Sequence, residues 1–490
     1  MQRLFRRTGF GRLRRAFDIV VFGVLPLGFT SSVLAISAHG SPAYGIEFKG
    51  NFWEPAKRIL AGESPYQPDR LTQVLHGQGP DFARTYIAQA AYPAPAHVVA
   101  VPFGLLPLGI ALPLFLVLSA LSLVVALRLL GVSDWRCYGL VFLGIPTVHA
   151  LNLGGLTPIL VLGVALLWRF RDSPWAAAAA TAAMISAKLY LWPLLLWLVF
   201  TRRFRSAALA CGLTLALVVG GWAVIGFAGF KEYPHLLGTL IRIHQGATYS
   251  VPTVGMTLGL SLHDARVMAI AVGIVLLALA LAFAQRKNER GAFAFALTAS
   301  LVLTPIVWQQ YFLVLLVPIA LVSPRLAFPW ALCLTFWLAT AEGHSSRDLI
   351  VAWATTAAVV GLAAARSPNG VRETRLVNRL RSSESLGPAS VVAAPQAEDR
   401  EQERREEDLN SDDHERRREN RHSLLREAPK SLSDPRRDDQ AAEHGPRCGQ
   451  TPAEQEAVLE AEPGDASLEP GIAVPEVVDG IDPSAETEAE

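Results

Sequence analysis

Acidic side chains are scarce in the first 366 residues of this chain, which carry 13 of them against 28 basic ones. Charged residues make up about 11% of that stretch but about 37% of the following 124 residues, where 30 are acidic and 16 basic. The first part is too apolar for a soluble domain, and the second is too polar to build a core. The composition therefore excludes a single soluble globular domain, although the net charge of the whole chain is only +1.

Cysteine is also scarce, and its four positions, 137, 211, 333 and 448, lie far apart. This spacing excludes a secreted disulfide scaffold and offers no pair with metal-ligand spacing. The sequence has neither a P-loop nor a dinucleotide fingerprint, so no nucleotide site is expected. We therefore expect no cofactor, no metal and no nucleic-acid partner.

In place of these features the chain has a succession of apolar runs between Phe17 and Ala365. Such runs are typical of transmembrane helices, and they predict an all-α fold, a polytopic bundle with about a dozen passes. The first run is long enough to span the bilayer and lacks the cleavage site of a signal peptide. We expect helices near residues 17–37, 97–127, 137–150, 155–168, 174–187, 189–200, 206–228, 265–284, 291–304, 310–322, 326–341 and 349–365.

Basic residues indicate how these helices are oriented. Six arginines precede the first span, which places the N-terminus in the cytoplasm. We therefore expect a multi-pass protein of the cell (plasma) membrane, embedded in membrane lipids, with both termini cytoplasmic. Alternation along the chain places every compact basic cluster on that same side: Arg128 with Arg136, Arg169 with Arg171, Arg202 with Arg203 and Arg205, Arg286 with Lys287 and Arg290, Arg325, and Arg366.

The chain thus divides into a basic N-terminus (1–16), a membrane domain (17–366) and a charged tail (367–490). The tail is rich in Glu, Asp, Arg, Pro and Ser and poor in aromatic residues, which predicts a disordered cytoplasmic segment. Such a tail either binds a partner or keeps the terminus soluble.

Three segments begin and end on the cytoplasmic side, at residues 136–169, 173–201 and 291–324. One straight helix cannot do this, so each segment is expected to be a helical pair with a turn at its apex. Each arm rises only about 20 Å, against about 30 Å of hydrocarbon, so the turns should lie below the outer surface. Polar backbone at that depth needs a cavity, and the alternative is a set of longer, tilted helices with surface turns.

Several polar residues fall at or near these apices and would floor an outward-facing cavity. Lys188 is the one lysine between apolar stretches, where a charge is functional by default, although it could also snorkel to the interface. The second outer loop adds two weaker candidates, which an ordinary solvated loop would also explain. The candidates for this pocket are Asn152, Lys188, Tyr190, Trp308, Gln309 and Gln310 from the apices, and Arg242 and His244 from the loop.

In the segment 46–66 of the first outer loop we expect an amphipathic helix that begins at Asn51, its N-cap. Such a helix lies flat on a membrane surface or covers the bundle. Just upstream of it, Glu47 stands in an apolar context and two residues before Lys49. Glu47 is therefore the candidate general base, with a structural salt bridge as the alternative.

Five segments of the membrane domain together resemble glycosyltransferase family 87, multi-spanning enzymes of the GT-C superfamily. The resemblance covers about residues 15–365 and rests on the order and spacing of the segments. It implies a GT-C-like fold and a hexosyltransferase, since the family includes actinobacterial mannosyltransferases that use polyprenyl-phosphate-mannose. The segments are EFKGNFWEPAKRILAGESPY (47–66), AYPAPAHVVAVPFGLLPL (91–108), LNLGGLTPILVLGVALL (151–167), AKLYLWPLLLWLVFTRRFR (187–205) and LTPIVWQQYFLVLLVPIAL (303–321).

The resemblance also implies roles for particular residues. The catalytic acid of the first outer loop falls on Glu47, where the family usually has Asp. The lysine of a Lys-x-x-x-Pro-type motif falls on Lys188, although four residues separate it from Pro193 in this chain. The family's Trp-Asp-His-like turn reads Trp308, Gln309, Gln310 here, without its charged members.

The chemistry that follows is a hexosyl transfer, most readily of mannose, from a polyprenyl phosphate to an extracytoplasmic glycan or glycolipid. Glu47 would take the proton of the acceptor hydroxyl, while Lys188 and Arg242 would stabilise the departing phosphate. Two alternatives stay open. A transporter or flippase for lipid-linked sugars would have polar sites near the midplane and two related halves. An inactive membrane scaffold would explain the missing charges at Gln309 and Gln310.

Overall fold

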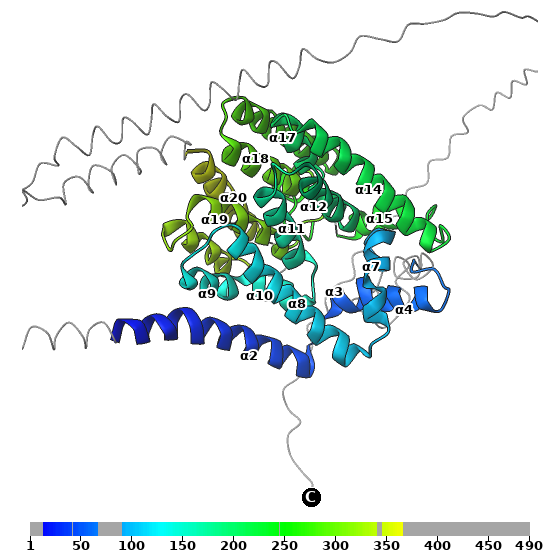
Figure 1. The fold of residues 1–490 in the computed structure, drawn as a ribbon, viewed down its shortest axis with the longest axis horizontal. Coiled ribbons are helices and arrows are strands. Elements are labelled where there is room, and N and C mark those ends of the chain that lie inside the picture. Colours follow the sequence, from blue (N-terminus) through cyan, green and yellow to red (C-terminus); the bar gives the residue numbers. More distant parts are fainter. Residues whose placement is uncertain (1–12, 42, 67–90, 245, 341–344, 366–490) are drawn as a thin grey trace, which may run out of the picture. The chain divides into compact units, whose positions relative to one another are not determined.

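The computed structural model describes residues 13–41, 43–66, 91–244, 246–340 and 345–365. The regular elements within these ranges are all helical, which confirms the expected all-α fold (Figure 1). The predictions for residues 1–12 and for the charged tail from residue 366 onward fall outside the described residues.

Five of the described helices are long and apolar enough to cross a membrane. Several such helices in one chain indicate a multi-pass membrane protein. They are Leu13–Gly40, which includes η1 (Val20–Val24) and α2 (Leu25–Gly40), then α8 (Leu108–Leu129), α14 (Phe204–Val224), α17 (Leu262–Gln285) and α20 (Ser346–Ala365).

Fewer helices reach spanning length than the dozen passes expected. The longest of the others have 14 residues, which is about 21 Å and too short for about 30 Å of hydrocarbon. One reason is proline, which stands in the first turn of α10, α11, α12 and α13 and starts a new helix there. The shorter helices are α3 (Ile46–Phe48), α4 (Glu54–Leu60), α7 (Ala94–Gly104), α9 (Trp135–Leu143), α10 (Ile145–Leu153), α11 (Thr157–Arg169), α12 (Pro174–Ala187), α13 (Pro193–Phe200), α15 (Tyr233–Ile243), α16 (Val251–Thr257), α18 (Glu289–Val302) and α19 (Leu316–Val322).

The breaks between short helices fall at the three apices predicted from the sequence. Helices α10 and α11 meet at an angle of 120° across residues 154–156. If this bent pair is counted as one broken span, the number of candidate membrane spans among the described residues rises to six. Helix α12 ends just before Lys188, which η3 (Leu189–Leu191) follows. Helix α18 ends at Val302, and η4 (Gln309–Leu315) begins after a short irregular stretch. The depth of these turns in a bilayer stays a prediction.

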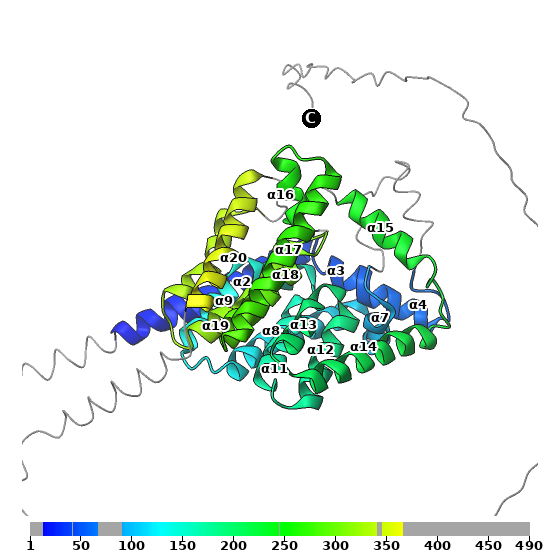
Figure 2. The same cartoon turned by 90° about the horizontal axis from the view of Figure 1, so that it is seen from above.

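The helices pack around one large apolar core. Trp197 and Phe293 are fully buried at its centre, with Trp168 edge-on to Phe293. Helices α17 and α18 lie side by side, as do α12 and α14 (Figures 1 and 2). The first span approaches α9 so closely that a Cβ at Gly139 would lie 1.9 Å from the Phe22 carbonyl oxygen. Glycine is therefore required at that crossing.

A group of four charged residues, here the Arg203 cluster, joins three turns between helices: Arg171, Asp172, Arg203 and Glu289. Arg203 Nη2 lies 2.7 Å from Asp172 Oδ1 and 2.8 Å from Glu289 Oε1, and Arg171 Nε lies 2.9 Å from Glu289 Oε2. The hydrogen bond from Arg203 lowers the pKa of the Asp172 carboxyl below its ordinary value. These turns carry basic clusters that the sequence assigned to one side of the membrane.

Three more short pieces complete the described elements. The π-helical turn η2 (Lys49–Trp53) joins α3 to α4, and the 3-10 turns η5 (Phe328–Cys333) and η6 (Thr335–Leu338) lie between α19 and α20. The expected N-cap at Asn51 is wrong, because Asn51 lies inside η2 and its side chain instead accepts a hydrogen bond from the Ala91 backbone at 3.0 Å. The helical stretch starts earlier than predicted, after Gly45.

Candidate active site

Glu47 is placed by a glycine turn and by the first hairpin apex. Gly45 has a left-handed backbone (φ 66°) at the start of α3, and an added Cβ would lie 2.4 Å from the Leu112 side chain. Its N–H donates to the Asn152 carbonyl oxygen at 2.8 Å, which ties α3 to the apex between α10 and α11. Glu47 therefore follows a turn that only glycine fits.

The same apex contributes a glycine that lies directly against the carboxylate. A Cβ at Gly155 would lie 2.9 Å from Glu47 Oε2, closer than ordinary packing allows. Next to it, Gly154 adopts φ 68° and leaves no room for a side chain against Phe48. The bare backbone of this turn thus makes space for the Glu47 side chain.

The Glu47 carboxylate has a hydrogen-bond donor at each oxygen. Tyr92 Oη donates to Oε1 at 2.5 Å, and Gln310 Nε2 donates to Oε2 at 3.3 Å. The side chain of Glu47 is only 12% exposed. The helix that carries Glu47, the segment before α7 and the third apex therefore meet at one carboxylate.

Lys188 lies at the same place and reaches Glu47 through Tyr92. Its Nζ donates to Tyr92 Oη at 2.9 Å and lies 3.9 Å from Glu47 Oε1. The ammonium group also lies 3.9 Å from the ring centroid of Tyr311, which stacks on Tyr190 at 5.3 Å. The Lys188 side chain is 12% exposed, like that of Glu47. We call Glu47, Tyr92, Lys188 and Gln310 the Glu47 cluster.

Several buried polar atoms in and around this cluster lack a hydrogen-bond partner within the described part of the chain. They include His149 Nδ1, Asn152 Oδ1, Tyr190 Oη and Gln310 Oε1. Buried polar atoms are rarely left unpaired in folded proteins, because each costs free energy when it loses water. Their presence beside Glu47 and Lys188 is what a site for a polar ligand requires.

Of the residues that the sequence analysis proposed for the site, the structure brings together Glu47, Lys188, Tyr190 and Gln310, with Asn152 next to them. Gln309 is fully buried, and its side-chain amide instead donates to the Ala339 carbonyl oxygen at 3.5 Å. Trp308 packs edge-on against His244, with ring centroids 4.9 Å apart. Burial lowers the pKa of His244 to about 4, so its ring carries no charge at neutral pH.

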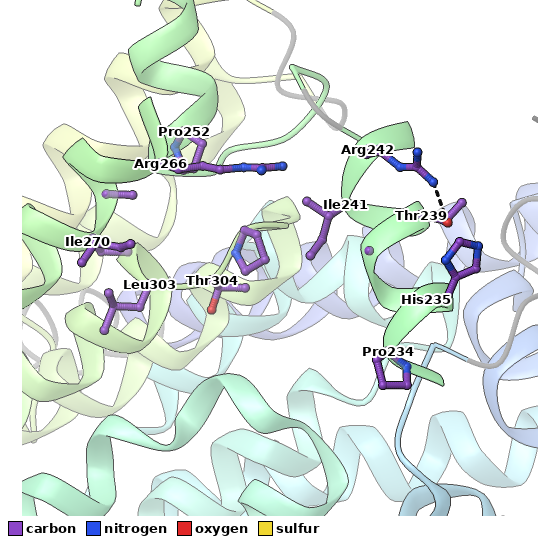
Figure 3. Close-up of a pocket in the computed structure, with 14 residues that line it drawn as sticks. Pro234, His235, Thr239, Ile241, Arg242, Pro252, Arg266, Ile270, Leu303 and Thr304 are labelled. Carbon is purple, nitrogen blue, oxygen red and sulfur yellow. Dashed lines mark hydrogen bonds between the residues drawn. The ribbon is translucent and has the colours of Figure 1, made fainter. Parts of the chain in front are cut away.

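Arg242 lies elsewhere, on α15, where Nη2 donates to Thr239 Oγ1 at 3.0 Å. It borders a cleft of about 680 Å³ between α15, α16, α17 and the end of α18 (Figure 3). Arg266 of α17 extends across this cleft toward α15, and Ile241, Ile270 and Leu303 line it. The residues that line the cleft do not include the members of the Glu47 cluster.

Besides Tyr311, whose ring contacts the Lys188 ammonium, the candidate residues from the sequence did not include Tyr92. It is 5% exposed, packs against Phe52 and holds both charged groups. A signal was present, since Tyr92 stands near the start of the segment AYPAPAHVVAVPFGLLPL (91–108). Nothing in that segment, however, indicates that the Tyr92 hydroxyl, the one side-chain hydroxyl in it, would meet Glu47.

Comparison with known proteins identifies one family. Residues 90–307 match the family model of glycosyltransferase family 87. The matched stretch contains Tyr92, Asn152 and Lys188, while Glu47 and Gln310 lie outside it. No curated protein and no solved structure matches this chain.

Proposed function

Residues 90–307 are a glycosyltransferase family 87 domain, which indicates a glycosyltransferase, and from this premise we propose the reaction that it catalyses. The protein transfers a hexose, mannose in the first instance, from a polyprenyl-phosphate donor to an extracytoplasmic glycan or glycolipid acceptor. The observation that carries the proposal is the buried pairing of Glu47 with Lys188 through Tyr92 in a chain with membrane-spanning helices. We place it in the cell membrane with both termini in the cytoplasm, as the basic residues predict.

Glu47 is the proposed general base. The acceptor oxygen attacks the anomeric carbon of the sugar while its proton passes to the Glu47 carboxylate. The bond between the anomeric carbon and the phosphate oxygen breaks, and its electron pair stays on the phosphate. The products are a glycoside of inverted configuration, a protonated Glu47 and a polyprenyl phosphate monoester. A carboxylate that is 12% exposed and held by two donors is oriented for this step.

Lys188 is the proposed partner of the donor phosphate. The negative charge on the phosphate rises as the glycosidic bond breaks, and a fixed ammonium group stabilises that rise more than it stabilises the starting donor. The rings of Tyr92, Tyr190 and Tyr311 hold the ammonium by cation–π contacts. Arg242 stays a proposed ligand of the lipid phosphate, but it lies on the cleft beside α15, which no member of the Glu47 cluster lines, so it would act there and not beside Lys188.

Tyr92 is the proposed positioning residue between the two groups. Its hydroxyl accepts from Lys188 and donates to Glu47, so one phenol fixes both side chains. The unpaired atoms of Asn152, Tyr190 and Gln310 are suited to bind sugar hydroxyls. Trp308, Gln309 and His244 shape the surrounding pocket, since two of them pack together and the third is buried.

The experiment is a transfer assay with membranes that contain the full chain. Radiolabelled polyprenyl-phosphate-mannose is supplied, with the nucleotide-linked sugar as the competing donor. The proposal expects label in a glycan or glycolipid from the lipid donor alone, and at least about 100-fold less label with Glu47→Gln.

Lys188→Ala should also lower transfer strongly, because the leaving phosphate loses its cation. Normal transfer by both variants would remove the mechanism. Movement of the intact lipid-linked sugar across the membrane without a covalent product would instead support the transporter reading, and no turnover of any donor would support a scaffold.

A further inference from the structure

The cleft beside α15 has the chemistry of a site for a phosphorylated lipid. Its volume of about 680 Å³ is within the usual range of ligand pockets. The walls are mainly apolar, through Ile241, Ile270, Val302 and Leu303, and none of the residues that line it is Asp or Glu. An occupant therefore needs an apolar body and no positive charge.

The cleft is also accessible from the lipid phase. One wall is α17, a helix long and apolar enough to cross a membrane, on which Val267, Ile270 and Ile274 are exposed. Arg266 lies in the second turn of that helix, which begins at Leu262. Charged groups near the end of a membrane span lie at the level of the lipid headgroups. A lipid chain can thus enter between α17 and α15 with its phosphate at the height of Arg266.

Arg266 has no described partner of its own. Its guanidinium extends over the cleft (Figure 3), and it forms neither a hydrogen bond nor an ion pair with any residue in the described ranges. Arg242, on the opposite wall, donates to the neutral Thr239 hydroxyl, a bond that a phosphate oxygen would outcompete. Two guanidinium groups and the His235 ring thus border one apolar cleft, and neither guanidinium has an acidic partner among the described residues.

The amount of charge favours a particular lipid. The proposed donor is a phosphodiester with one negative charge, whereas the carrier left after transfer is a monoester with about −1.5 to −2 charges at pH 7. Two arginines match the monoester better than the donor or an ordinary diester phospholipid. The cleft also adjoins the reaction centre along the chain, since Thr304 and Pro305 line it and Gln310 lies a few residues further on.

We propose that this cleft binds the spent polyprenyl phosphate monoester after it leaves the Glu47 cluster, with Arg266 as the main phosphate ligand and Arg242 as the second. The inference rests on the proposed function, because that reaction is what produces the monoester. The cleft then separates the released carrier from the next donor molecule.

The test uses the full chain in phosphatidylcholine nanodiscs, without sugar donor or acceptor. Binding of a polyprenyl phosphate is compared with binding of its methyl diester of the same chain length, by native mass spectrometry. We expect the monoester to bind about tenfold more tightly at pH 7.5 and to lose this preference below about pH 6, where it becomes singly charged. Phosphatidylglycerol serves as a further diester.

The variants assign the site. Arg266→Ala should weaken monoester binding about tenfold and Arg242→Ala less, because a guanidinium–phosphate contact is a strong charge-assisted hydrogen bond. Arg286→Ala is the matched control, an exposed arginine at the opposite end of α17, about 30 Å away. If Arg266→Ala lowers the unfolding temperature, Arg266→Gln keeps the packing of the stem and removes the charge.

Equal binding of monoester and diester, or binding that Arg266→Ala and Arg266→Gln leave unchanged, would overturn the inference. Tighter binding of phosphatidylglycerol would also overturn it and assign the cleft to a membrane phospholipid. The proposed function is tested separately. If Glu47→Gln abolishes transfer but monoester binding does not depend on Arg266, the inference about the cleft is wrong and the proposed function stands. If the protein transfers sugar from no lipid-phosphate donor, the proposed function is wrong.

Discussion

The Glu47 cluster and the Arg203 cluster both join carboxylates to cations, but they are built differently. In the Arg203 cluster the opposite charges touch, at 2.7 to 2.9 Å, and its two carboxylates are 36% and 74% exposed. In the Glu47 cluster the charges stand 3.9 Å apart, both side chains are 12% exposed, and a phenol hydroxyl lies between them.

This difference separates structure from function. Direct, partly exposed ion pairs bring opposite charges into contact and hold turns in place, at little net gain in stability, although Arg203 Nη1 has no hydrogen-bond partner within the described residues. Buried charges that do not touch are costly, since the lost hydration is not repaid by close contact. A protein retains such an arrangement where a ligand completes it. The unpaired polar atoms around Glu47 and Lys188 support that reading.

The largest effect among the tests of this comparison is expected from Tyr92→Phe. Removal of the hydroxyl takes one hydrogen bond from Glu47 and one from Lys188, and bonds to charged groups are worth about 1.5 to 3 kcal/mol each. Transfer should fall about 10- to 100-fold, mainly in kcat, because the two charged groups lose their fixed positions. Steady-state kinetics with labelled donor measure this, and a kcat within twofold of the wild type would show that Tyr92 positions nothing.

A smaller effect is expected from Gly155→Ala. The new methyl group would lie 2.9 Å from Glu47 Oε2 and would push the carboxylate or the apex aside. Overpacking of this kind costs about 1 to 3 kcal/mol, and transfer should fall about tenfold. The matched control is Gly361→Ala in α20, where a Cβ meets no atom within 4 Å. If the two variants unfold at the same temperature and transfer equally well, the apex does not pack on the carboxylate.

In the Arg203 cluster we expect Glu289→Gln to affect stability alone. The change removes the charge that faces Arg171 and Arg203, and for partly exposed pairs the loss is about 1 kcal/mol. The unfolding temperature should fall slightly while kcat and KM for the donor stay as in the wild type. A loss of transfer as large as that of Tyr92→Phe would erase the distinction between the two clusters.

The smallest effect is a dependence of stability on pH at Asp172. Its pKa is lowered in the folded protein, chiefly by the hydrogen bond from Arg203. Asp172 therefore contributes fully to the free energy of unfolding at pH values above 3.8, the ordinary pKa of its carboxyl. This contribution is lost as the pH falls through the lower pKa that the carboxyl has in the folded protein. Unfolding temperatures between pH 3 and pH 6 should drop less steeply in Asp172→Asn than in the wild type, and identical slopes would contradict the assignment.

Much of the fold could be predicted because helix breaks have local causes. The apices at 150–155 and 187–190 follow from glycine, proline and the positions of basic residues, and the structure breaks its helices there. Fewer helices reach spanning length than the dozen passes expected, because many of the apolar runs are divided into helices of 14 residues or fewer.

The sequence indicated which charged residues belong to the candidate site, but not which side chain connects them by hydrogen bonds. Glu47 and Lys188 stood out because charged residues are rare among apolar runs, and such residues carry their own signal. Tyr92 did not, since the position of a hydroxyl depends on how an irregular segment packs against α3 and α12. The prediction for Asn51 failed for the same reason. Its residue type suits a helix N-cap, but in the folded chain the side chain is buried and accepts a hydrogen bond from the Ala91 backbone.

The central claim is that the Glu47 carboxylate acts in the chemical step and is not there only for structure. The most direct measurement pairs donor binding with single-turnover transfer in purified Glu47→Gln, in which the amide keeps the size of the side chain but cannot accept the proton. The account predicts folding and donor affinity close to those of the wild type, with transfer reduced at least about 100-fold. Transfer at the wild-type rate by a variant that binds donor normally would contradict it.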